Sequence, residues 1–250
     1  MSKGWIISGK GLRIGVGPTT ITIKNDGTFE SNGVPLLLGF DMCPHWIDIS
    51  YNHLKTALRM NRLGIRENET SSKVSMLLEK EFIAGMQSIT ATCTAIDAFF
   101  HGTLKNLDNS DQLREQWKSS KKGTARYKRV AETLRQAFKL DDKQAKNFKE
   151  TIRLIYDFRD RVVHPDSTQK GVVRHPEFGY KVEWRFAAFR AINAKNALGN
   201  ALQVIEHCCV HESHFRNKEV ASYCKALHKD IKPTIKKWNR AYGNLYGKGI

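Results

Sequence analysis

One run of apolar residues limits the folds that this chain can adopt. Over residues 73–104, apolar side chains recur at steps of three and four, the spacing of one helix face: Leu78, Phe82, Met86, Ile89, Cys93, Ile96 and Phe100. Ser71 or Ser72 can cap such a helix, because a short hydroxyl side chain accepts from the free N–H groups of the first turn. A seam of this length has to be buried. The sequence therefore predicts a long helix that forms a core or a dimer interface.

The first forty residues have the pattern of strands. Apolar and polar residues alternate in 12–16 and in 20–24, which is the period of a strand. Turn residues at 25–27 and 32–33 separate these runs from a further apolar run at 34–40. Short strands joined by hairpin turns are predicted here.

The remaining segments are helical in pattern, with polar links. Trp46 to Leu63 is spaced as a short helix, and residues 105–128 are polar and predict a loop. Further helices are expected around Val130 to Phe138, from the cap Asp141 to just before Pro165, over Trp184 to Cys209, and over Asn217 to Leu245 with a break or kink at Pro233. The fold class is mainly α: a small β-rich region with a short helix at 1–69 precedes a helical domain at 70–250.

The net charge is +16, and its distribution is uneven. Residues 1–70 contribute +2, residues 71–170 contribute +6, and residues 171–250 contribute +8. A chain this basic favours nucleic acid or another polyanion as its partner. The alternative is charge that serves only to keep the protein in solution.

Cysteine content and hydropathy indicate the compartment. The five cysteines form no small disulfide framework, and the N-terminus has no apolar segment of signal-peptide length. No stretch approaches the roughly 18 consecutive apolar residues of a membrane-spanning helix. We therefore expect a cytoplasmic protein without a membrane partner.

Chemistry-bearing residues gather at the end of the predicted helix that begins at Asp141. Arg159 is followed directly by Asp160 and, five residues on, by His164 and Pro165. Arginine is always charged, and its planar guanidinium can donate two parallel hydrogen bonds to a phosphate. Histidine exchanges a proton near neutral pH. On its own, this pattern is equally that of a helix end whose basic side chains face the last carbonyls.

Helical geometry separates the two key side chains. At about 100° per residue, Arg159 and His164 lie about 140° apart on a regular helix. Either the last turn unwinds ahead of Pro165, or a second copy of the chain completes the site. The sequence leaves both alternatives open.

The stretch from Arg159 to Pro165 resembles the R-x4–6-H signature of the HEPN superfamily, in the form with a polar residue after the arginine. The segment Thr94 to Phe100 resembles the first long helix of these proteins. The likeness covers roughly residues 71–250. It implies a HEPN-like helical bundle with the activity of a metal-independent endoribonuclease, of the kind used as a toxin or an antiviral defence effector. Such proteins commonly dimerise so that two motifs share a cleft.

The resemblance implies roles for the residues of the motif. His164 would be a general acid or base, Arg159 would bind the scissile phosphate, and Asp160 would orient a neighbour. Arg161 would grip the RNA. No cofactor is implied; RNA, a second copy of the chain, and a cognate antitoxin or regulatory protein are the implied partners. Asp97 lies beside the apolar seam, so its carboxylate either points into water or needs a partner, for which Arg159 or His164 would serve.

A basic segment before the motif helix is a further candidate for RNA binding. Lys121, Lys122, Arg126 and Lys128 crowd around Gly123, and a flexible basic loop can contact phosphates. A solvated run of charge is the alternative.

A group of histidines and cysteines has to be weighed as a zinc site. The residues are His207, Cys208, Cys209, His211 and His214, with Cys224 and His228 further on. Their spacing fits finger patterns poorly. We expect a helix end with packed cysteines and no metal.

Two other interpretations remain. The chain can be a catalytically inactive HEPN-like module that binds RNA or protein. It can also be an interaction protein whose β region senses a partner while the helical part responds.

Overall fold

The computed structural model describes residues 9–31, 33, 36–66, 71–119, 124–163, 171–211 and 214–247. The described chain is mainly helical with a small β region at the N-terminus, as predicted. Its elements are β1 (Leu12–Val16), β2 (Ile21–Ile23), β3 (Phe29–Ser31), β4 (Leu36–Phe40), α1 (Cys43–Arg66), α2 (Ser71–Lys105), α3 (Ser110–Ser119), α4 (Arg126–Ala137), α5 (Asp142–Val163), β5 (Val173–Arg174), β6 (Lys181–Val182), α6 (Trp184–Ala188), α7 (Ala191–Val210) and α8 (Lys218–Tyr242).

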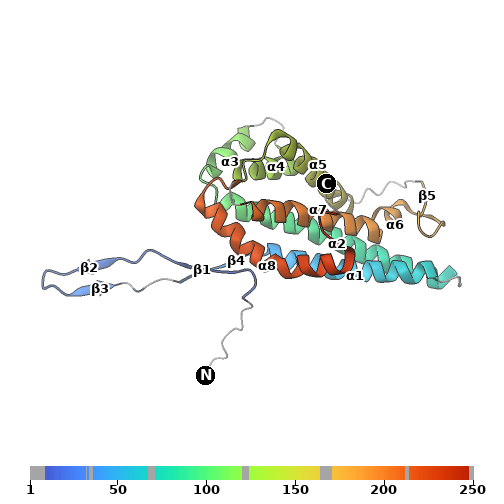
Figure 1. Ribbon diagram of the computed structural model, residues 1–250, viewed down its shortest axis with the longest axis horizontal. Coiled ribbons are helices and arrows are strands. Elements are labelled where there is room, and N and C mark those ends of the chain that lie inside the picture. The colour runs from blue at the N-terminus through green and yellow to red at the C-terminus, as the bar shows by residue number, and fades with distance from the viewer. Residues whose placement is uncertain are drawn as a thin grey trace, which may run out of the picture.

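The N-terminal strands form an arm that projects from the helices (Figure 1). β1 pairs antiparallel with β4, and β2 pairs antiparallel with β3 further out. The turn between β2 and β3 needs Gly27, whose φ of +79° lies in the left-handed region. The apolar side chains of the arm remain in solvent: Phe29 is 71% exposed and Ile23 66% exposed.

The base of the arm is tied to the helical body by polar contacts. Asp230 of α8 accepts from the backbone N–H of Gly11 at 3.1 Å and from Nη1 of Arg13 at 2.8 Å. Arg13 also pairs with Asp41 at 3.3 Å. Gly11 has a φ of +74°, and a Cβ there would lie 2.4 Å from the carbonyl oxygen of Asp41. The chain therefore needs glycine at this position.

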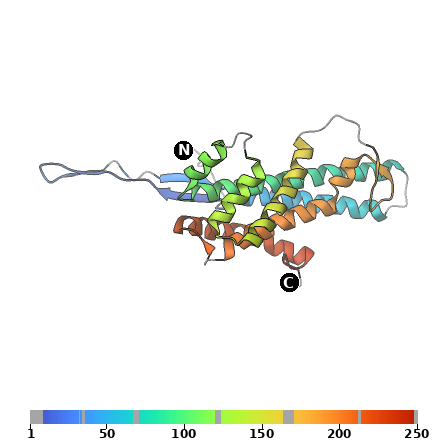
Figure 2. The ribbon, with the colours of Figure 1, turned by 90° about the horizontal axis from the view of Figure 1, so that it is seen from above.

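α1 and α2 lie against each other along the lower part of the body (Figures 1 and 2). α1 is longer than the predicted short helix at 46–63, and its buried residues belong to the same core as those of α2. Ser50 of α1 hydrogen-bonds to Ser88 and Thr92 of α2 inside this contact. Small hydroxyl side chains that satisfy each other let the two helices approach closely.

The predicted apolar seam is buried. Ile89, Cys93, Ile96 and Phe100 are almost fully buried in the core that α2 shares with α1, α4, α5 and α7, while Phe82 and Met86 are partly buried. No other chain is needed to cover it. The seam is therefore core, the first of the two alternatives that its pattern allowed.

The predicted single helix over residues 184–209 is wrong, because it is interrupted between α6 and α7. Arg190 has an extended backbone, and Glu81 of α2 accepts from the N–H of Ala191 at 2.8 Å, which caps α7. The carbonyl of Phe189 sits against Gly85, where a Cβ would lie 1.9 Å from the oxygen. The contact with α2 breaks the helix, and periodicity alone does not reveal it.

Two other boundaries differ from the sequence prediction. Part of the expected loop at 105–128 is helical, since α3 and the first turn of α4 fall within it. The expected break or kink at Pro233 does not interrupt α8, which remains one helix from Lys218 to Tyr242. No helix in the described part of the chain has the length and apolar character needed to cross a bilayer.

The arm and its base should contribute differently to stability. Replacing residues 17–35 with Asn-Gly, a two-residue turn suited to a hairpin, should change the free energy of unfolding by less than about 0.5 kcal/mol. Asp230→Ala should lower it by about 1–3 kcal/mol, because the Gly11 N–H loses its acceptor. Urea denaturation measures both. Equal losses in the two variants would show that the outer arm supports the helical body.

Candidate functional site

The motif helix α5 is fixed at both its start and its inner face. At its start, Gln144 N–H donates to Asp141 at 2.7 Å, and Asp141 N–H donates to the Gln144 side chain at 3.2 Å, which confirms the predicted capping box. Along the helix, Ile152, Ile155 and Tyr156 are buried. The end of α5 that carries the motif is therefore held in place by buried side chains of the same helix.

Asp97 is the polar anchor between α2 and α5. Its carboxylate accepts from the hydroxyl of Tyr156 at 2.5 Å and from Nε of Arg126 at 2.7 Å. Of the two partners expected for Asp97, Arg159 is wrong, because Tyr156 and Arg126 hold the carboxylate, and His164 lies outside the described residues. Burial, followed by the charge of Asp97, raises the pKa of Tyr156 far above its usual range. The phenol therefore stays a donor to Asp97.

Arg159 lies one turn beyond this anchor. Its guanidinium sits 5.3 Å from the ring centre of Tyr156, and its Nε lies 3.0 Å from a carboxylate oxygen of Asp160. The side chain is 29% exposed, and Asp160 is its ion-pair partner among the described residues. A half-buried cation supported by an aromatic ring can still present its outer nitrogens to an anion.

The motif is only partly described. Arg159 and Asp160 are brought together, whereas His164 lies outside the described residues. α5 is helical through Val163, so no unwinding occurs in the described part of the motif.

His101 is a candidate that the sequence interpretation missed. It lies one turn after Asp97 on α2, and its Nε2 is 2.9 Å from Nη2 of Arg126. Burial, followed by the charge of Arg126, lowers the pKa of His101. The ring is therefore neutral near pH 7 and can accept from Arg126. The i, i+4 pair of Asp97 and His101 on one helix face was the signal that could have revealed it.

The predicted RNA-binding residues do not form one group. Arg126 is held by Asp97, and Lys128 lines a separate hollow of about 480 Å³ beside Lys146 and Lys149 of α5. Arg161 lies over the ring of Phe158 at 5.6 Å. Lys121 and Lys122 lie outside the described residues.

The histidines and cysteines near the end of α7 separate into two groups. Cys208 and Cys209 are buried in the core near Cys224, and burial raises the pKa of both thiols well above the usual range. The rings of His207 and His211 lie 4.6 Å apart, and His214 stacks on His211 at 5.5 Å. Within the described ranges, no cluster of three or more His, Cys, Asp or Glu side chains could hold a metal ion.

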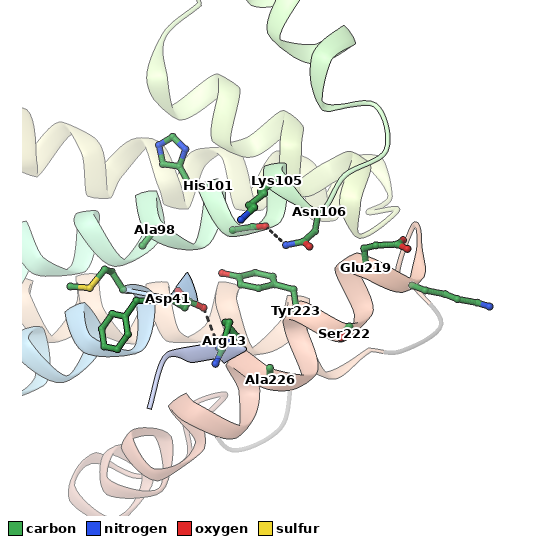
Figure 3. Close-up of a pocket in the computed structure, with 14 residues that line it drawn as sticks. Arg13, Asp41, Ala98, His101, Lys105, Asn106, Glu219, Ser222, Tyr223 and Ala226 are labelled. Atoms are coloured by element: carbon green, nitrogen blue, oxygen red, sulfur yellow. Dashed lines mark hydrogen bonds and ion pairs between the residues drawn. The ribbon is translucent and has the colours of Figure 1, made fainter. Parts of the chain in front are cut away.

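A cavity of about 780 Å³ lies on the other side of His101, between α2, α8 and the base of the arm (Figure 3). Tyr223 reaches from α8 toward α2, where a Cβ at Gly102 would lie 2.2 Å from its hydroxyl oxygen. Arg13, at the base of the arm, is already paired, because it contacts both Asp41 and Asp230. The other charged residues that line the cavity are Lys105, Lys218 and Glu219.

Comparison of the chain with protein-family models, with curated proteins and with solved structures returns no match.

Removing the donor that holds Asp97 should cost far more than removing a surface ion pair. Tyr156→Phe keeps the buried ring but leaves the carboxylate with one donor fewer, so the free energy of unfolding should fall by about 1–3 kcal/mol. Asp157→Ala, which removes the exposed i, i+4 pair with Arg153 on the same helix, should cost about 0.5 kcal/mol or less. Urea denaturation compares the two. Similar losses would show that Asp97 does not anchor α5 to α2.

Proposed function

We propose that this protein is a metal-independent endoribonuclease of the HEPN type. The observation that carries the proposal is the placement of Arg159, half-exposed at the end of α5, on a helix held to α2 through Tyr156 and Asp97. A cation on such a rigid support is preorganised for phosphate, which is the requirement for stabilising charge in a transition state. The net charge of +16 supports a polyanionic substrate.

The proposed reaction needs only groups of the protein and the RNA. The ribose 2′-oxygen attacks the adjacent phosphorus as a base removes its proton, and the bond to the 5′-oxygen breaks as an acid protonates that oxygen. The products are a 2′,3′-cyclic phosphate and a 5′-hydroxyl. His164 is assigned the role of acid or base, Arg159 stabilises the charge on the phosphate oxygens, and Asp160 orients Arg159 through their 3.0 Å contact.

The resemblance also suggests a biological setting. A toxin or an antiviral effector that cuts RNA has to be restrained, so a cognate antitoxin or another regulatory protein is a proposed partner. We further propose a homodimer, since α5 is helical to Val163 and a regular helix directs Arg159 and a residue five positions later about 140° apart.

A catalytically inactive HEPN-like module that binds RNA or protein is the second candidate. The ion pair between Arg159 and Asp160 favours it, because a carboxylate at 3.0 Å offsets part of the charge that a phosphate would meet. The two candidates differ in whether RNA is cut.

Cleavage should not need a divalent metal and should depend on two residues. In excess EDTA, the purified protein should cut single-stranded RNA, and His164→Ala should slow the reaction by roughly 10²–10⁴-fold, the range for losing an acid–base group. Arg159→Ala should lose comparable activity, because the phosphate charge is then unopposed. Gel analysis of the products, including detection of cyclic phosphate ends, provides the measurement.

A matched control lies one and a half turns earlier on the same helix. Arg153→Ala removes an exposed arginine that pairs with Glu150 and Asp157, so its activity should stay within about twofold of the wild type, as for a surface charge away from the site. Activity that requires a metal ion, or that survives the loss of both Arg159 and His164, would eliminate the proposed mechanism. RNA binding without any cleavage would favour the second candidate.

Mixing two inactive variants tests whether the site is shared. If Arg159 of one protomer works with His164 of the other, an equal mixture of Arg159→Ala and His164→Ala chains should recover about a quarter of wild-type activity, because half the dimers are mixed and each has one complete pair. The RNase assay measures recovery after the chains have been allowed to exchange. A fully active monomer in sedimentation would instead place both residues of the site in one chain.

A further inference from the structure

A small hollow between α2, α3 and α4 is lined by cations and aromatic rings. Its volume is about 300 Å³, and its lining residues are Phe100, His101, Leu104, Arg114, Trp117, Lys118, Arg126 and Arg129. No carboxylate is among these residues. Concentrated positive charge of this kind favours an anionic ligand.

The cations of the hollow differ in whether they already have an ion-pair partner. Arg126 is paired with Asp97, and Lys118 is paired with Glu115 at 2.8 Å on the exposed surface. Arg114 and Arg129 have no ion-pair partner in the part of the chain that the structure describes, and Nε of Arg129 is enclosed without an acceptor there. An enclosed N–H without an acceptor is costly, so a ligand oxygen at this place is favoured.

The aromatic groups give the hollow a second kind of contact. The rings of Phe100 and Trp117 lie 6.1 Å apart, and the guanidinium of Arg126 covers Phe100 at 4.5 Å. Trp117 is only partly buried. A partly buried tryptophan beside arginines that have no ion-pair partner is a combination that suits single-stranded nucleic acid, in which bases stack on the ring while cations hold phosphates.

The hollow adjoins the candidate catalytic region through direct contacts. Arg159 lies against the Tyr156 ring, Tyr156 donates to Asp97, and Asp97 holds Arg126, whose other nitrogen contacts His101 at the rim of the hollow. Asp97 therefore connects the support of Arg159 with a residue that lines the hollow.

We propose that the hollow is a nucleotide subsite for single-stranded RNA, in which Arg114 and Arg129 bind a phosphate flanking the scissile bond and Trp117 stacks on a base. The assignment rests on the proposed function for the position of the scissile bond. The subsite itself rests on the cations, the ring and the unpartnered Nε of Arg129. The subsite would bind RNA with little sequence preference, and Arg159 would remain available for the reacting phosphate.

The test separates binding from cleavage by using a 2′-O-methyl RNA oligonucleotide, which has no free 2′-hydroxyl to attack. The double variant Arg114→Ala with Arg129→Ala should bind it about tenfold more weakly, and the slope of affinity against salt should fall because fewer phosphates are contacted. The control Lys232→Ala with Lys236→Ala removes the same charge from the exposed face of α8 and should stay within about twofold, since neither lysine lines the hollow and exposed charges are screened by salt. Fluorescence anisotropy measures both. Equal weakening by the two pairs, or none by the first, would overturn the subsite.

A second comparison tests the base contact. Trp117→Leu should weaken binding of the oligonucleotide about five- to tenfold, the size of one lost base stack. The same substitution should not change the binding of an abasic strand of the same length. Equal weakening for both strands would show that Trp117 only supports the fold. If the double arginine variant unfolds, Arg114→Ala alone, an exposed position, carries the test.

Two further outcomes distinguish this proposal from others. Displacement of the oligonucleotide by 5′-AMP at equal concentration would overturn the assignment to an RNA strand in favour of a free nucleotide. Wild-type protein that binds through Arg114 and Arg129 but never cuts RNA would keep the subsite and end the nuclease proposal. If the protein cuts RNA through Arg159 while both subsite variants bind and cut RNA normally, the nuclease proposal stands and the subsite is overturned.

Discussion

The burial of α2 is the constraint on which the rest of the structure depends. In its second half, residues such as Ile89, Ile96, Phe99 and Phe100 are enclosed over much of the helix circumference. A helix with such a wide apolar surface cannot be stable with one neighbour. α1, α4, α5 and α7 therefore pack against it, and the order of the bundle follows from the need to cover it from several directions.

A carboxylate beside this apolar surface creates the link between core and site. Burying part of Asp97 is unfavourable unless donors meet it, and the donors come from two different elements, Tyr156 of α5 and Arg126 of α4. The same contacts that satisfy Asp97 also fix the end of α5 and the start of α4. The position of Arg159 is thus set by the hydrogen bonding of Asp97 together with the packing of Ile155 and Tyr156.

The sequence was informative where a pattern is local and incomplete where contacts are distant. The seam, the capping box of Asp141 and Gln144, and the strands at the N-terminus follow from spacing, and the structure confirms them. The need of Asp97 for a partner was also predictable, but its identity was not, because Arg126 is 29 residues away and its place depends on how α4 packs. The break before α7 has the same origin, since it is caused by Glu81 and Gly85 of α2. Local periodicity contains no information on which distant side chain makes a given contact.

The arginines of this protein fall into those that pair with carboxylates within the fold and those that have no such partner among the described residues. Arg13 and Arg126 are paired with carboxylates at partly buried places, and each joins two elements of the fold. Arg114 and Arg129 both line one hollow and have no such partners among the described residues. Like charges that gather in this way repel each other, which lowers stability unless an anion joins them. A ligand that binds only the folded state adds to its stability, so the proposed binding of a polyanion in the hollow would offset this repulsion.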